Sequence, residues 1–85
     1  MKAKLISNDP SLNLMFRLGG IEIEQVDRID ESLDMFKTSV KDDNLAVLIL
    51  SRTIYNHISK DVDYYRENQS EPLIVVIDGW LEEIC

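Results

Sequence analysis

The chain is poor in several residue types on which particular structures and chemistries depend. It has one cysteine, Cys85, and one histidine, His57, among its 85 residues. A single cysteine cannot form an intramolecular disulfide, and without a second cysteine or histidine beside it the chain has no zinc-binding pattern. We therefore expect no metal site and no structural disulfide, and a reduced, cytoplasmic environment fits this composition.

Long apolar runs and basic residues are also scarce. The longest uninterrupted apolar run, Leu45–Leu50, has six residues, whereas a membrane-spanning helix needs about 20. Nine basic and sixteen acidic residues give a formal net charge of -7. Because nucleic acids and anionic membranes attract positive charge, the sequence predicts neither a nucleic-acid partner nor direct membrane insertion.

The residues that are present are typical of a small folded domain. Hydrophobic residues make up 45% of the chain and charged residues 29%, which is a globular composition. A chain of this length has room for one core. We assign residues 1–79 to a single α/β domain and residues 80–85 to a C-terminal tail that resembles the start of a helix.

Four short apolar runs alternate with three helical patterns. The runs are Ala3–Ile6, Ile21–Val26, Leu45–Leu50 and Leu73–Ile77. The helical patterns are a segment after Asp9-Pro10, an apolar stripe of Ile29, Leu33, Phe36 and Val40, and a second stripe of Ile54, Ile58, Val62 and Tyr65. Strands separated by helices pair in parallel through right-handed crossovers. The sequence thus predicts a small doubly wound, Rossmann-like sheet of four parallel strands in the order 2-1-3-4, with helices on both faces.

Local signals support these boundaries. Asp9 before Pro10 is typical of a helix N-cap followed by proline in the first turn. Gly19 is expected to supply the left-handed residue that ends this helix. In the second run Ile21 and Ile23 alternate with glutamates, which indicates a strand with one exposed face at the edge of the sheet.

The ends of the predicted strands carry no recognisable cofactor motif. A dinucleotide site needs a glycine-rich first turn, but Ser7-Asn8-Asp9 stands there, and the P-loop pattern is absent. A phospho-acceptor receiver domain shares the predicted topology but needs an aspartate where Ser51 stands. We expect no cofactor, and a degenerate receiver-like signalling or protein-interaction module stays open as an alternative function.

No catalytic constellation is visible either. His57 lies between Asn56 and Ile58 on the third helical pattern, without a serine–acid relay or a metal-binding neighbour. It is interpreted as a surface or boundary residue. With no activated nucleophile or acid–base pair, we expect a protein without catalytic residues.

Two segments suggest contact with a partner. In Phe16-Arg17-Leu18-Gly19-Gly20 an arginine stands between two large apolar residues at a helix end. Arg17 can complement the helix C-terminus, or its guanidinium can dock on another protein, and the sequence leaves both interpretations open. The apolar residues Trp80, Leu81 and Ile84 lie too near the C-terminus to be fully covered by a small core, which also suggests a contact surface.

At this motif the chain resembles the F subunit of the V-type and archaeal-type rotary ATPases. The residues that carry the resemblance are Asp9, Phe16–Gly20, Ile21-Glu22, Glu31–Phe36, Leu45–Ser51 and Glu71–Ile77. The chain departs from the family pattern at Ser7-Asn8, where a glycine is usual, and at Asp78-Gly79-Trp80, where a proline-rich turn is usual. Family members also usually continue through a C-terminal helix.

The resemblance implies a non-enzymatic role in a complex that couples ATP to ion transport. The F subunit attaches to the antiparallel coiled coil of the D subunit, and both form the central stalk that rotates inside the catalytic A/B hexamer. The protein would then be cytoplasmic and peripheral to a membrane. Candidate residues for the interface with the D-like coiled-coil partner are Phe16, Arg17, Leu18, Trp80, Leu81 and Ile84.

Overall fold

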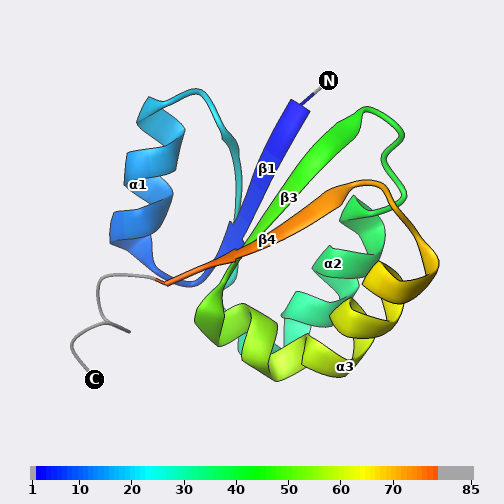
Figure 1. Ribbon diagram of the computed structural model, residues 1–85. Helices are drawn as coiled ribbons and strands as arrows, with labels where there is room; N and C mark the ends of the chain where they lie inside the picture. The colour runs from blue at the N-terminus through cyan, green and yellow to red at the C-terminus, as the bar shows by residue number, and fades with distance from the viewer. Residues whose placement is uncertain (1, 79–85) are drawn as a thin grey trace.

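The computed structural model, in which residues 2–78 are described, contains one four-stranded parallel sheet with helices against both of its faces (Figure 1). The elements in chain order are β1 (Lys2–Ser7), α1 (Pro10–Leu18), β2 (Glu22–Gln25), the short 3-10 helix η1 (Ile29–Glu31), α2 (Ser32–Ser39), β3 (Leu45–Ser51), α3 (Arg52–Asn68) and β4 (Leu73–Ile77). The strand order is β2-β1-β3-β4 and every pairing is parallel. The predicted topology is confirmed, with β2 at an edge.

The first helix begins as the sequence predicts, but its end has a different geometry. Asp9 Oδ1 accepts hydrogen bonds from the backbone N–H groups of Ser11 at 2.9 Å and Leu12 at 3.4 Å, so it is a true N-cap. The prediction that Gly19 is the left-handed residue is wrong, because its φ is -85°. Gly20 takes that conformation instead, with a φ of 85°, and this allows the chain to turn into β2.

The second helix is shorter than its apolar stripe suggested. Ile29, expected on that stripe, lies in η1 and is 37% exposed. The tighter 3-10 turn rotates successive side chains by a larger angle than an α-helix does, so Ile29 falls off the buried face. The Ser32 hydroxyl donates to the Ile29 carbonyl at 2.6 Å and joins η1 to α2. Phe36 is buried as predicted, with 2% exposure.

The main core lies between the sheet and the helices α2 and α3. Its buried members are Ile6, Val26, Phe36, Leu45, Leu48, Leu50, Ile54, Ile58, Val62 and Ile74. The stripe on α3 is therefore confirmed at Ile54, Ile58 and Val62, although the helix is kinked at Ile58. Of the helices within residues 2–78, none is long and apolar enough to span a bilayer.

Candidate interaction site

Two serines at the carboxyl ends of the strands, where doubly wound sheets bind ligands, form hydrogen bonds within the chain. The Ser7 hydroxyl accepts from the Asp9 backbone N–H at 2.9 Å, and the Ser51 hydroxyl donates to Asn8 Oδ1 at 3.4 Å. Ser51 is fully buried. The receiver-like alternative gains no support here, because the residue at its phospho-acceptor position is an enclosed hydroxyl.

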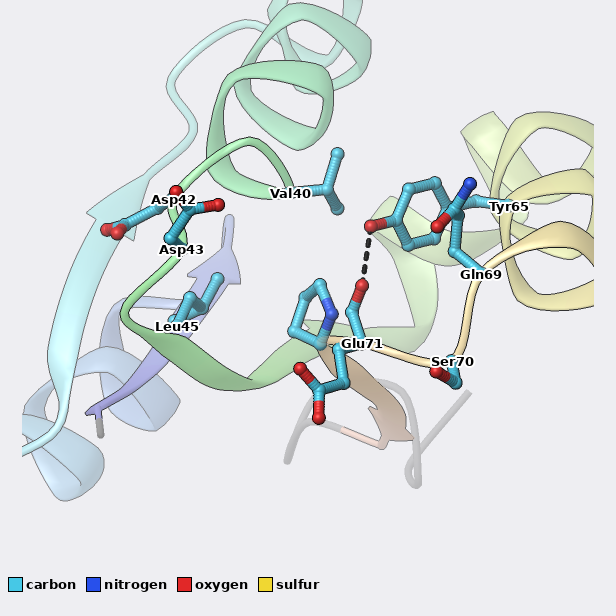
Figure 2. A pocket seen from close by; sticks show the side chains of 9 residues that line it. Val40, Asp42, Asp43, Leu45, Tyr65, Gln69, Ser70 and Glu71 are labelled. Carbon is cyan, nitrogen blue, oxygen red and sulfur yellow. Dashed lines mark hydrogen bonds between the residues drawn. The ribbon is translucent and has the colours of Figure 1, made fainter.

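A cavity of about 360 Å³ lies at the other end of the strands, beside the amino ends of β3 and β4. Figure 2 shows the Tyr65 hydroxyl directed at the Glu71 backbone carbonyl, to which it donates at 2.7 Å. Asp42, also on the wall, forms an ion pair with Lys2 at 2.7 Å. Across residues 2–78 no three histidine, cysteine, aspartate or glutamate side chains are grouped to hold a metal ion.

The last two turns of α1 expose apolar side chains. Leu18 is 81% exposed, Leu14 57% and Met15 49%. Residues three and four apart on a helix are surface neighbours, so these three form one group, and the exposed Arg17 lies beside them. We call Leu14, Met15, Arg17 and Leu18 the α1 patch.

The sequence motif identified part of this patch. Arg17 and Leu18 are exposed as a contact site requires, whereas Phe16 is half-buried and contributes only part of its ring. Leu14 and Met15 were missed as site residues. The sequence did hold a sign of their exposure. Five of the nine residues of α1, PSLNLMFRL, are apolar, which is more than one buried stripe needs.

A second apolar surface lies on the same side of the sheet as α1. Leu48, Leu50 and Ile74 point into the core under α2 and α3, so their alternate neighbours on β3 and β4 face the other way. These neighbours are Val47, Ile49, Leu73, Val75 and Ile77, which we call the uncovered face. Among residues 2–78 no helix covers them, since α1 packs on β1 and β2.

The strand register makes the uncovered face continuous. Val47 is paired with Leu73, and Ile49 with Val75, and paired residues of parallel strands lie on the same side. Exposure rises away from α1. Leu5 on β1 is fully buried, Ile49 and Val75 are half-buried, and Leu73 is 60% exposed. Parallel sheets are normally covered on both faces, so this surface is suited to contact with another protein.

The other predicted interface residues, Trp80, Leu81 and Ile84, lie outside the described residues. The chain reaches them from the end of β4, where Asp78 Oδ1 accepts a hydrogen bond from Arg52 Nε at 3.0 Å. In the sequence they begin three residues after Ile77, the last residue of β4. His57, the unassigned histidine, is exposed on α3.

Two comparisons with known proteins found a match, one to a protein family and one to a solved structure. The family model described as ATP synthase (F/14-kDa) subunit matches residues 5–83. The fold is similar to that of the F subunit of the V-type ATP synthase from Archaeoglobus fulgidus, with a TM-score of 0.59 and 22% sequence identity over 89% of this chain and 95% of that chain. No curated protein matches the chain.

Proposed function

Since the chain belongs to the family of ATP synthase (F/14-kDa) subunits, we propose that it is a non-catalytic central-stalk component of a V/A-type ATPase. It docks on the coiled coil of a D-like protein and rotates with it inside the catalytic A/B hexamer. In this role it supports rotary ion transport without binding a cofactor. Its place is cytoplasmic and peripheral to the membrane, as part of the membrane-bound complex.

One observation carries the proposal. The α1 patch and the uncovered face lie on the same side of the sheet, and both present apolar side chains that the described residues leave exposed or half-buried. A single long helix can lie across such a surface, as amphipathic helices do in apolar grooves. Phe16, which is half-buried on α1, borders this surface, and Trp80, Leu81 and Ile84, outside the described residues, stay candidate interface residues.

Arg17 adds a positively charged group that can recognise carboxylates on the partner. Arg17 has no side-chain hydrogen bond or ion pair to any other residue within 2–78. Its five N–H donors are therefore free to meet carboxylates on the partner. Apolar neighbours around a charged group exclude water when an interface closes, and arginines in this setting often dominate binding.

The proposal is tested by binding to the D-like coiled-coil protein encoded in the same genome. The double variant Leu14→Ser/Leu18→Ser removes the apolar part of the α1 patch. We expect its dissociation constant to rise by about tenfold to a hundredfold, or about 1.4–2.8 kcal/mol. The matched control is Tyr64→Ser, which removes a side chain that is 69% exposed on α3, across the sheet from α1.

The two variants must differ for the proposal to stand. Both should keep the circular dichroism spectrum of the parent chain, because all three side chains are largely exposed. If the control weakens binding as much as the double variant, the coiled coil contacts a different side of the sheet. If the parent chain does not bind the coiled coil at all, the proposed rotor role is wrong.

A further inference from the structure

A groove between α2 and α3 has no part in the proposed docking on the coiled coil. It has a volume of about 340 Å³, and its walls come from both helices. It lies on the face of the sheet opposite α1, so a protein on the α1 patch leaves it open (Figure 1). Any partner of this groove can bind at the same time as the coiled coil.

The floor of the groove is apolar and fixed in position. Phe36 is 2% exposed, and the ring of Tyr65 packs against it edge to face. The Tyr65 hydroxyl is held by the Glu71 carbonyl at 2.7 Å, as Figure 2 shows. Val40, the residue that follows α2, completes the floor, and Tyr64 stands on the α3 side with 69% of its surface exposed. Ordered aromatic side chains of this kind lose little conformational entropy when a partner binds.

The rim formed by the C-terminal end of α2 and the turn after it, which we call the α2 rim, carries two free positive charges in an acidic protein. Lys37 and Lys41 line the groove and are exposed. Within residues 2–78, neither side chain forms a hydrogen bond or an ion pair. Lys2 and Lys4, in contrast, are both paired with carboxylates. On the α3 rim the charge is negative, from Asp61.

We propose that this groove is a docking site for an amphipathic α-helix of a protein partner, with acidic residues on the flank that faces α2. Lys37 lies in the last turn of α2, and Lys41 lies in the turn that follows the end of this helix at Ser39. Two carboxylates on one flank of the docked helix can each meet one of these ammonium groups. Asp61 selects a basic residue on the other flank, and the opposite signs of the two rims set the direction in which the helix lies.

The test uses two synthetic helical peptides of about 15 residues, long enough to form a helix on binding. They share the same leucines at positions one turn apart. One carries glutamates along a flank, and the other carries lysines at those positions. Each is titrated into the full chain labelled with ¹⁵N, and the shifted amide signals are mapped. We expect shifts at Phe36, Lys37, Val40, Lys41 and Tyr64, and about tenfold tighter binding of the acidic peptide.

Charge reversal separates the groove from general electrostatic attraction. Lys37→Glu/Lys41→Glu should reverse the preference, so that the basic peptide binds more tightly. The control Arg28→Glu/Lys60→Glu makes the same change in net charge at exposed residues that line neither the groove nor the α1 patch. It should keep the preference for the acidic peptide. Equal binding of both peptides, shifts outside the groove, or a reversal in the control would each overturn the proposal.

Discussion

The ring of Tyr65 meets the ring of Phe36 edge to face, with 5.8 Å between the ring centroids and 85° between the ring planes. Phe36 belongs to α2 and Tyr65 to α3, so this contact joins the two helices that cover one face of the sheet. Edge-to-face pairs add to the free energy gained from burying the rings alone. Phe36 therefore stabilises both the core and the packing of α2 on α3.

Phe36→Ala should lower the free energy of unfolding by about 3–5 kcal/mol, because it empties a fully packed site and removes the ring contact. This is a large fraction of the stability of so small a domain. Urea denaturation followed by circular dichroism measures the change. Tyr64→Ala, which removes the exposed aromatic side chain next to Tyr65, should change the free energy of unfolding by less than about 1 kcal/mol. Equal effects would mean that Phe36 is not a core residue.

Asp9→Ala should cost about 1 kcal/mol of stability, because the N–H groups of Ser11 and Leu12 lose their acceptor. Asp9→Asn is the matched control, since an asparagine oxygen at the same position can still accept those hydrogen bonds. Thermal unfolding of the three proteins gives the comparison. A loss in the asparagine variant as large as in the alanine variant would show that the negative charge, and not the cap, is what stabilises α1.

The sheet topology and the core of α3 could be predicted because they follow from signals that act along the chain. Asp9-Pro10 marks a helix start, and helical crossovers force parallel pairing with a fixed hand. The stripe of Ile54, Ile58 and Val62 needs only the helix period. These signals act between residues that are near in sequence, and the structure confirms the helix start, the parallel pairing and the stripe.

Other features depend on distant parts of the fold, and the sequence did not settle them. The exposure of Leu14 and Met15 depends on α1 covering only β1 and β2, which the pattern of α1 does not contain. Ile29 fits the period of α2, but it lies in the 3-10 helix η1, which comes before α2 begins. Gly20, and not Gly19, has the left-handed conformation, because Gly19 still continues the hydrogen bonding of α1. Its backbone N–H donates to the Phe16 carbonyl.

The pKa of Asp42 should rise in Lys2→Met. The hydrogen bond from Lys2, assisted by the Asn44 backbone N–H, holds the pKa of the Asp42 carboxyl below its usual value. The contribution of this pair to stability is thus present above the unfolded-state pKa and is lost as the pH falls through the lowered one. Titration of the ¹³C carboxyl signal measures the pKa. It should move only part of the way to the ordinary value, because the Asn44 hydrogen bond remains. An unchanged pKa would show that the ion pair is not formed in solution.

ATP should not bind to this chain. The first turn of the sheet, Ser7-Asn8-Asp9, has no glycine that would allow a phosphate group to approach the backbone. Calorimetric titration with ATP at millimolar concentration should give no saturable heat. A dissociation constant in the micromolar range would contradict the interpretation of this domain as a non-catalytic component of the complex.

Arg17→Ala should separate binding from stability. In the free domain Arg17 is exposed and has no side-chain partner within residues 2–78, so its removal should change the free energy of unfolding by less than about 0.5 kcal/mol. Binding to the D-like coiled coil should weaken by about 1–3 kcal/mol, because carboxylates buried against the guanidinium lose their partner. Arg17→Lys is the matched control. It keeps the charge but not the planar donor fork, and should recover only part of the affinity. Destabilisation of the free domain would make Arg17 a structural residue that complements the end of α1. If neither quantity changes, the interface does not include the α1 patch.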